Sequence, residues 1–361
     1  MGYAGVRGGQ EAIAAAERLV RAARYGGRSA WLELDQITGG LPLAVDRVMG
    51  EGGLWAPEIT ARAIRQSQGD LLEAAQLLRA HRSTMPRLGY SLPVPMDEAG
   101  TTRRVSAAYR NPPGGQFLGA TADYVPQILD LGDGDGADLA GDPGAAPAAP
   151  DPAGTTGAAG APPGLLAELR EAGLLAERPS RADAEPFDIT RTPARPGAPR
   201  SGRLSAMARA ETGSLVHLWY SVIRRPEHVA PEIPVELRRR TLPVRVAHPY
   251  TGRPVTVARA EVTEARTVRG AGVPGEDPTR FDVGYGLCFG AVEAKALAMA
   301  GLDLLVHRAP EADRLEQKVL THLDGPEASG FLEHLKLPHY VDFRSALERL
   351  RAVHTTAGGA R

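Results

Sequence analysis

Two histidines near the C-terminal end of the chain have the residue type and spacing to begin a metal site. His334 and His339 flank a short turn that Pro338 closes. Neutral imidazole is a good zinc ligand, and zinc takes four ligands in structural sites or three plus an open position in catalytic ones. The five-residue offset puts the rings on different faces of a regular helix, and Pro338 argues against a continuous helix, so a turn must bring them together. On spacing alone, ordinary loop histidines are the favoured alternative, because this spacing is a weak signature.

Four carboxylates near glycine turns or a helix start are candidates for catalysis. They are Asp46, Glu51, Asp123 and Glu293. Glycine turns often line sites, but ordinary turn chemistry and intrahelical ion pairing explain the same residues. For Glu293, which follows Gly290, capping at the positive end of a helix dipole accounts for the carboxylate without any function. The residues alone do not choose among the four.

Glycines and arginines supply candidates for nucleotide or phosphate contact. Gly284 and Gly286 precede a strand-to-helix junction, where a backbone can approach a phosphate at a helix N-terminus; tight packing of the strand against the helix is the alternative. Arg191 lies in an arginine- and proline-rich segment whose guanidinium forks suit phosphate oxygens; a solvated basic face or a docking strip for a partner is the alternative. The full candidate set is Arg47, Gly114, Gly115, Gln116, Arg191, Gly284, Gly286 and Lys295.

Hydrophobic periodicity predicts the elements that must position these residues. Alanine and leucine recur in helical rhythm over residues 10–25, 41–49, 57–66 and 70–85. Gly69 and Asp70 supply a helix stop and the next helix cap. Runs of Val, Leu, Thr and aromatic residues predict strands over 214–223, 242–247, 254–267 and 281–289, followed by a helix over 291–307. The expected fold class is α+β.

Composition divides the chain into three regions. Residues 132–164 are almost entirely Gly, Ala, Pro, Asp and Thr, a composition that cannot bury enough apolar surface to offset its ordering entropy. We expect a mainly helical domain over 1–131, a disordered linker over 132–164 and an α+β domain over 165–361. A short helix is expected over 165–175, an extended strip over 178–199, and regular structure again from about Leu204.

Composition and charge also exclude several classes of protein. The formal charge of -1 gives no general affinity for nucleic acid. One cysteine, Cys288, excludes an internal disulfide framework and fits the cytoplasm; we expect it to be a buried small residue. No uncharged apolar run approaches the roughly 20 residues of a bilayer span, so we expect no integral membrane protein.

A series of motifs, in order along nearly the whole chain, resembles the PhnI family, a subunit of the bacterial carbon–phosphorus lyase core complex. The motifs include Val6-Arg7-Gly8-Gly9, Asp46-Arg47-Val48-Met49 with Glu51-Gly52-Gly53, Pro113-Gly114-Gly115-Gln116, Asp188-Ile189-Thr190-Arg191-Thr192-Pro193, Gly284-Tyr285-Gly286-Leu287-Cys288-Phe289-Gly290, and His334-Leu335-Lys336-Leu337-Pro338-His339. No single motif is diagnostic, but their ordered co-occurrence is. One departure stands out: the family commonly has arginine where this chain has Ala294.

The resemblance implies a function in phosphonate catabolism. Proteins similar to this one act with PhnG, PhnH and PhnL subunits to displace adenine from MgATP by an alkylphosphonate, giving a ribose 1-phosphonate 5-triphosphate. The isolated subunit is a purine nucleosidase on ATP and GTP. Such a reaction develops positive charge at the ribose C1′, for which carboxylates and arginines are the natural tools.

The resemblance further implies that His334 and His339 bind zinc at the contact with PhnJ, which contributes a cysteine. The expected cofactors are therefore a shared zinc ion and the magnesium that accompanies ATP. An alternative hypothesis makes the chain mainly a scaffold that supplies two histidines to that zinc site.

Overall fold

The computed structural model describes residues 9–27, 30–121, 129, 164–176, 185–225, 232–270, 277, 279–308, 312–321, 323–335 and 340–358. The side chains at 97, 307, 308, 312, 313, 330, 333–335, 340 and 341 are outside this description. Every structural statement below refers to the described residues.

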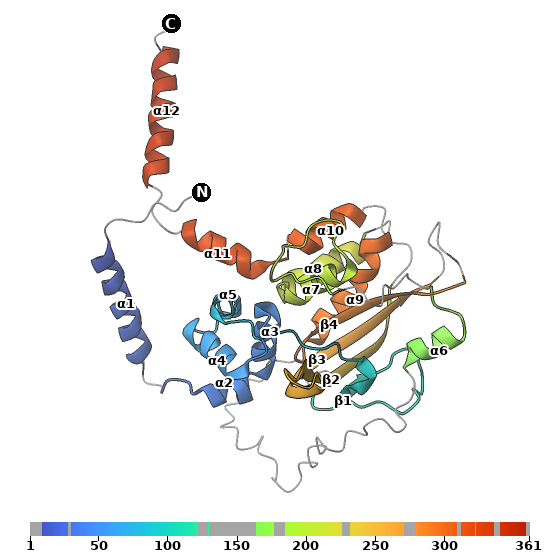
Figure 1. The fold of residues 1–361 in the computed structure, drawn as a ribbon. Helices are drawn as coiled ribbons and strands as arrows, with labels where there is room; N and C mark the ends of the chain where they lie inside the picture. The colour runs from blue at the N-terminus through green and yellow to red at the C-terminus, as the bar shows by residue number, and fades with distance from the viewer. Residues whose placement is uncertain are drawn as a thin grey trace.

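An antiparallel sheet forms the centre of the structure. Its strands in the described part of the chain are β1 (Gly100–Val105), β2 (Ile233–Ala247), β3 (Pro254–Arg269) and β4 (Asp282–Phe289), and they pair in sequence order (Figure 1). β1 comes from the first third of the chain, yet it pairs with β2 through partners such as Arg104 and Arg238. The sheet therefore joins the region expected to be helical to the C-terminal region. Together with the helices, it confirms the α+β class.

One face of the sheet carries α9 (Glu293–Arg308), and glycines let the helix come close. A Cβ atom added to Gly284 would lie 2.0 Å from the carbonyl oxygen of Ala300, and one added to Gly286 would lie 2.0 Å from that of Ala296. No side chain fits at those distances. The predicted strand over 281–289 and helix over 291–307 are both confirmed.

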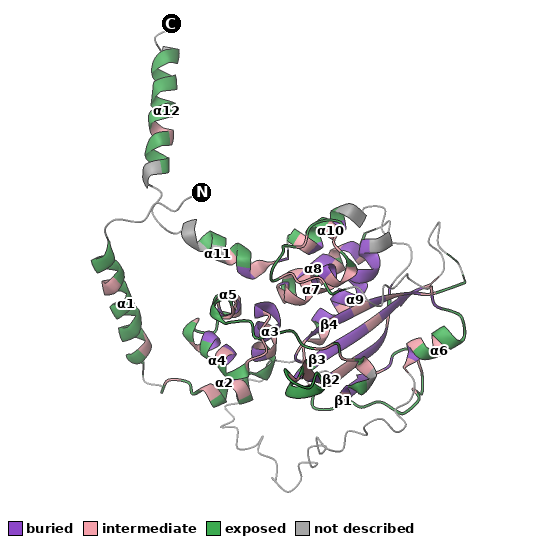
Figure 2. Cartoon of the chain, viewed as in Figure 1, coloured by how far each residue is buried: buried purple, intermediate pink, exposed green. Residues whose placement is uncertain are grey.

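Three further helices lie against α9: α7 (Arg200–Arg209), α8 (Thr212–Ile223) and α10 (Ala312–Thr321). Their apolar side chains form the largest buried cluster of the described residues together with those of α9 and the sheet, and α9 is largely purple in Figure 2. The strand predicted over 214–223 is wrong, because this segment is α8. Glu211 caps the helix by accepting from the backbone of Gly213 and Ser214, and Leu215, Leu218 and Val222 bury one face at helical spacing.

A second, smaller core belongs to the helices before the sheet. α2 (Leu34–Gly40), α3 (Pro42–Gly52), α4 (Pro57–Gln66) and α5 (Leu71–Thr84) surround Ile37, Val48, Ile64 and Leu78, none more than 3% exposed. The helices predicted over 41–49, 57–66 and 70–85 are confirmed. Asp70 caps α5 as expected, accepting from the backbone of Leu72 and Glu73.

The remaining elements lie around these two cores. They are α1 (Gln10–Tyr25), the short helix η1 (Met96–Glu98), α6 (Leu165–Glu171), α11 (Gly325–Leu335) and α12 (Tyr340–Gly358). In Figure 1, α1 and α12 stand apart from the main body, and no described side chain of either is buried. Nearly all of the expected linker, 132–164, lies outside the described residues. In the part of the chain that the structure describes, no helix is both long and apolar enough to cross a membrane.

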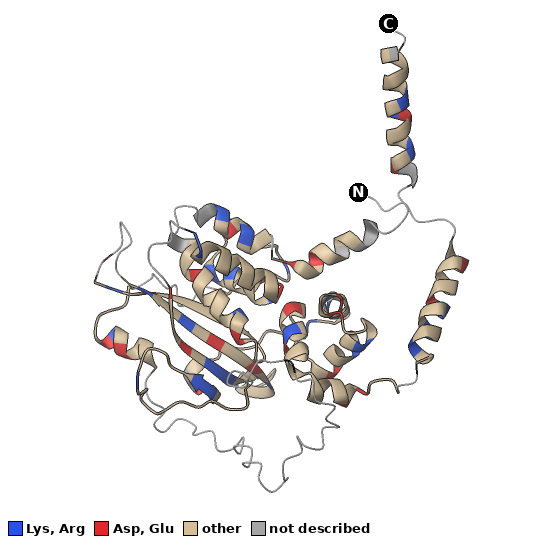
Figure 3. Cartoon of the chain, turned by 180° about the vertical axis from the view of Figure 1, so that it is seen from behind, with Lys and Arg blue, Asp and Glu red and all other residues tan. Residues whose placement is uncertain are grey.

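The sheet face opposite α9 is charged rather than apolar. Glu236, Arg238, Glu264 and Arg266 alternate in sign across β2 and β3, as the strands of Figure 3 show. Ion pairs join them, including Arg266 Nη2 to Glu264 at 2.8 Å. At one end of the sheet, Leu165 and Leu169 of α6 pack against Val235 and Val268.

Candidate functional site

The start of α9 is where residues distant in sequence converge. Gly290, with φ of 69°, turns the chain from β4 toward α9, and Asp46 of α3 lies directly against it. The backbone N–H of Ala291 donates to Asp46 Oδ2 at 2.9 Å. Burial raises the pKa of Asp46, while the Ala291 hydrogen bond and the charge of Arg239 partly oppose that rise. Asp46 is thus a carboxyl group with raised proton affinity at a helix N-terminus.

Glu293, the first residue of α9, is held by two arginines of the sheet. Arg103 Nε donates to Glu293 Oε1 at 2.6 Å, and Arg239 Nη2 lies 3.6 Å from the same oxygen. The Arg103 side chain is 1% exposed, whereas that of Glu293 retains 15%. Asp46 of α3 and Glu293 of α9 therefore both lie at the start of α9, Asp46 with a raised pKa and Glu293 in an ion pair.

Glu51 belongs to the same region but is fully buried. Its Oε1 accepts from Thr212 N at 2.9 Å, from Thr212 Oγ1 at 2.7 Å and from Arg47 Nε at 2.9 Å. Arg47 also forms an ion pair with Glu211, the capping residue of α8. The second oxygen of Glu51 has no hydrogen-bond partner among the described residues. Glu51 therefore links α3 to α8 through hydrogen bonds and is not accessible to solvent.

Lys295 is also buried in this region, and its charge interacts with that of Glu51. Its side chain is 1% exposed and donates from Nζ to the carbonyl oxygen of Ala210 at 2.8 Å. Burial lowers the pKa of Lys295 to about 8, with Cys288 and Glu51 acting in the opposite direction. Burial also raises the pKa of the Cys288 thiol to about 11, so this cysteine is a neutral core residue, in agreement with the sequence interpretation.

The glycine candidates have structural explanations in the fold. Gly284 and Gly286 face α9, which favours the packing alternative over phosphate contact. Gly114 and Gly115 adopt positive φ in a turn, and Gln116 bonds the backbone of Ser106 through both ends of its amide. A phosphate role for these residues stays a prediction.

Arg191 lies on the surface and away from α9. Its side chain is 64% exposed, 3.8 Å from Asp188 and over the ring of Tyr90. Arg87 binds the same aspartate at 2.7 Å and the same ring. Asp123 lies outside the described residues, so its place relative to the other carboxylates is not defined.

The histidine pair also falls largely outside the description. His334 belongs to α11, which ends at Leu335, but its side chain is not described; His339, just before α12, is not described at all. Within the described residues no three His, Cys, Asp or Glu side chains gather as metal ligands. The expected break between the two histidines agrees with the end of one helix and the start of the next.

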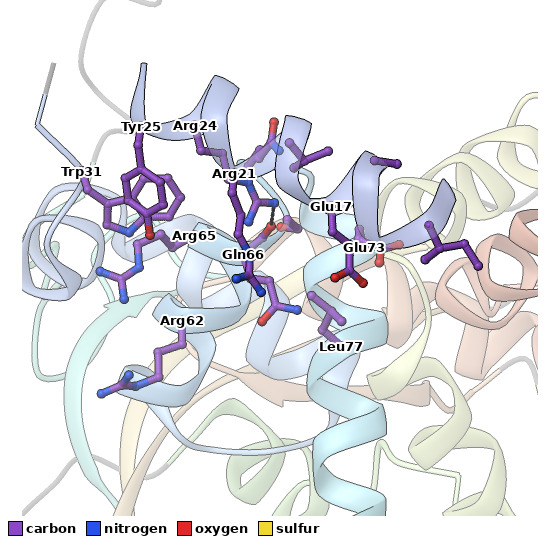
Figure 4. A pocket seen from close by; sticks show the side chains of 15 residues that line it. Glu17, Arg21, Arg24, Tyr25, Trp31, Arg62, Arg65, Gln66, Glu73 and Leu77 are labelled. Atoms are coloured by element: carbon purple, nitrogen blue, oxygen red, sulfur yellow. Dashed lines mark hydrogen bonds between the residues drawn. The ribbon is translucent and has the colours of Figure 1, made fainter. Parts of the chain in front are cut away.

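A groove in the described surface lies elsewhere. A groove of about 1010 Å³ separates α1 from α4 and α5, and Arg24 and Arg65 lie over Trp31 at its edge (Figure 4). None of the candidate residues lines it. The chemistry-bearing groups are instead gathered at the junction of α3 and α9, where Arg103 and Arg239 are functional candidates that the sequence analysis missed.

Comparison with known proteins identifies the family of this chain. Residues 2–357 match the family described as "Bacterial phosphonate metabolism protein (PhnI)". The chain belongs to the PhnI family. This membership confirms the resemblance seen in the sequence and places the chain in phosphonate metabolism.

Three curated relatives of the PhnI family align over nearly their full length. The chain is 41% identical to "Putative C-P lyase subunit protein HtxH" of Stutzerimonas stutzeri, covering 99% of this chain and 97% of that protein. It is 39% identical to "Alpha-D-ribose 1-methylphosphonate 5-triphosphate synthase subunit PhnI" of Escherichia coli K12, covering 97% of each. The protein of the same name from Rhizobium meliloti is 36% identical, covering 98% of this chain and 96% of the relative. These relatives are named as subunits of a multi-subunit enzyme.

Proposed function

We propose that this chain, with partner subunits, displaces adenine from MgATP by an alkylphosphonate to give a ribose 1-phosphonate 5-triphosphate. The observation that carries the proposal is the position of Asp46 and Glu293 at the start of α9, where Arg103 and Arg239 lie beside Glu293. The names of two relatives describe a subunit of an alpha-D-ribose 1-methylphosphonate 5-triphosphate synthase. We further propose a cytoplasmic location.

The two carboxyl groups suit opposite requirements of the reaction. A phosphonate oxygen forms a bond to the ribose C1′ while the bond from C1′ to the purine nitrogen breaks, and the purine must take up a proton. Asp46 is the candidate proton donor because burial raises its pKa. Glu293 is the candidate stabiliser of positive charge at C1′, since its ion pair with Arg103 holds the carboxylate in a fixed orientation.

Water in place of the phosphonate gives a nucleosidase. The same acid and stabiliser would then release adenine or guanine from ATP or GTP, which is the activity we propose for the chain without its partners. Magnesium enters with the nucleotide, whose charge it lowers. Glu51 and Lys295 are assigned no direct contact with substrate here, because both are fully buried; we propose that they position α3 and α8 around the site.

The zinc proposal concerns the other end of the chain. We propose that His334 and His339 bind a zinc ion shared with a PhnJ-type subunit, and that PhnG-, PhnH- and PhnL-type subunits complete the complex. The supporting points are the residue types and the weak spacing signature of the two histidines.

A double variant tests the zinc proposal. Purified complex with His334→Ala and His339→Ala should lose zinc, measured by atomic emission, while complex with exposed His81→Ala should keep it. Full zinc content in the double variant would refute the assignment.

Free adenine is the product that tests the main proposal. The purified chain is incubated with MgATP, and the products are separated by chromatography. Adenine with ribose 5-triphosphate is the expected pair. Release of inorganic phosphate instead would replace glycosyl transfer with an ATPase, and neither product, from the chain or the complex, would favour the scaffold alternative.

A further inference from the structure

Three arginine side chains from two helices meet at the C-terminal end of α3. Arg79 and Arg82 come from α5, and Arg209 is the last residue of α7. Gly53, with φ of 67°, ends α3; a Cβ there would lie 2.5 Å from Arg82 Nη1 and 3.6 Å from Arg209 Cδ. Arg79 joins the group by donating to the carbonyl oxygens of Glu51 at 2.9 Å and Arg209 at 2.8 Å.

Acidic groups also lie near this cluster: the charges of Asp324 and Glu327 act on Arg209, and that of Asp188 acts on Arg82. Arg79 forms an ion pair with Asp324. Neither Arg82 nor Arg209 forms an ion pair with any described residue, and Arg209 Nε is buried without a hydrogen-bond partner there. A buried polar group without a partner is costly, so its retention calls for an explanation.

Helix capping explains only part of the cluster. Arginines near a helix C-terminus commonly bond the last carbonyls and favour the negative end of the dipole. Arg79 does so, and Arg82 does so with one bond to the carbonyl oxygen of Gly53 at 3.1 Å. Arg209 caps nothing in α3: its side chain donates no bond to a described residue. Burial and the charges of Arg79 and Arg82 lower the pKa of Arg209 to about 10.

The distance between this arginine cluster and the proposed site indicates which kind of anion the cluster would bind. Asp46 and Gly53 are seven residues apart, and a helix rises about 1.5 Å per residue, so about 10 Å of α3 separates them. An extended ribosyl triphosphate spans a comparable length. Arg47 is half-buried between the two ends, with a side chain that is 34% exposed.

We propose that Arg79, Arg82 and Arg209 form a site for the polyphosphate chain of the nucleotide at the C-terminal end of α3. The choice of a nucleotide polyphosphate rests on the proposed function; the anion site itself rests on the cluster. Planar guanidinium forks bind phosphate oxygens in pairs, and several of them together neutralise a polyanion that one lysine would not. The polyphosphate end is thereby anchored while Asp46 and Glu293 face the ribose.

Inorganic tripolyphosphate tests the site without any chemical reaction. Its binding to the purified full-length chain is measured by calorimetry for the parent, Arg82→Gln, Arg209→Gln and, as a control, Arg62→Gln on the exposed face of α4. We expect each cluster variant to bind about tenfold or more weakly than the parent, from the usual worth of a charged hydrogen bond, and the control to bind as the parent does.

Thermal unfolding of the ligand-free protein separates binding from structure. Arg209→Gln removes repulsion from Arg79 and Arg82, attraction to Asp324 and Glu327, and no hydrogen bond to a described residue. Its unfolding temperature should therefore stay close to that of the parent, while the rise caused by tripolyphosphate should shrink. A lower unfolding temperature with unchanged tripolyphosphate affinity would make Arg209 structural and overturn the inference. Parental affinity in both cluster variants would overturn it as well.

The two proposals fail in different ways. Binding that depends on the cluster, with no adenine released from MgATP, would leave the anion site standing and refute the glycosyl transfer. Adenine release at parental rate and affinity by Arg82→Gln and Arg209→Gln would refute the anion site and leave the proposed function intact.

Discussion

Replacing Gly286 by alanine should destabilise the protein strongly, because α9 leaves no room for a side chain. The added Cβ would lie 2.0 Å from the carbonyl oxygen of Ala296, and real Cβ atoms are essentially never found closer than 3.0 Å to such a neighbour. Helix and strand must therefore separate by about 1 Å over a contact that both use for their core. Overpacking lowers the free energy of unfolding by about 1–3 kcal/mol, occasionally more. We expect a loss of about 3 kcal/mol or more for Gly286→Ala, since a backbone oxygen cannot rotate away.

Urea unfolding measures this loss, and Gly39→Ala supplies the control. Gly39 lies in α2 with nothing within 4 Å of an added Cβ, so alanine there should leave the free energy of unfolding unchanged or raise it by about 0.5–1 kcal/mol. A Gly286→Ala protein that unfolds at the parental urea concentration but has lost nucleotide affinity would refute the packing argument. It would then assign the glycine to phosphate contact.

Two other substitutions follow from buried charges near α9. Arg103→Met should lower the free energy of unfolding in urea by about 3 kcal/mol, the lower end of the range for a broken buried ion pair, because Glu293 keeps only Arg239, at 3.6 Å, among the described residues. A loss below about 1 kcal/mol would contradict the importance of the ion pair between Arg103 and Glu293. For Lys295, the folded pKa of about 8 lies below the ordinary 10.5, so the unfolded chain binds more protons between these values and stability from this residue rises with pH across that window. Relative to Lys295→Met, the free energy of unfolding of the parent should therefore rise from about pH 8 to 10. Parallel curves of unfolding free energy against pH for the two proteins would contradict the burial of a charged lysine.

The fold was predictable where a local pattern and the tertiary environment agree. The helices over 57–66 and 70–85 have clear periodicity and punctuation, with Asp70 capping α5 as expected. The prediction for residues 214–223 was wrong because a run of Leu, Val, Ile and aromatic residues also fits a strand. The Glu211 cap and the helical spacing of Leu215 and Leu218 decided for a helix.

β1 could not be predicted, because its residues depend on distant partners. Its sequence, Gly-Thr-Thr-Arg-Arg-Val, has two arginines that a strand core would ordinarily reject. They are buried because Arg103 binds Glu293 and Arg104 lies 3.2 Å from Glu236, pairs that only the assembled sheet creates. For the same reason, the sequence alone did not indicate Arg103 and Arg239 as site residues.

The candidate site was predictable as residue types but not as an arrangement. Asp46 and Glu293 were both candidates, yet nothing local indicates that Asp46 caps the start of α9 rather than pairing within α3. Glu51 and Lys295 carry suggestive chemistry, but their full burial is a property of the packed α3, α8 and α9. Geometry thus separates groups that can meet a substrate from groups that hold the site together.

The rate of adenine release by Asp46→Asn tests the central claim most directly. Asparagine keeps an oxygen for the Ala291 N–H but cannot supply the proton, so with MgATP we expect a fall of about 100-fold or more at an unchanged urea midpoint. Asp35→Asn, on the exposed surface of α2, should release adenine at the parental rate. Adenine release by Asp46→Asn at the parental rate would contradict the assignment of glycosyl transfer to the junction of α3 and α9.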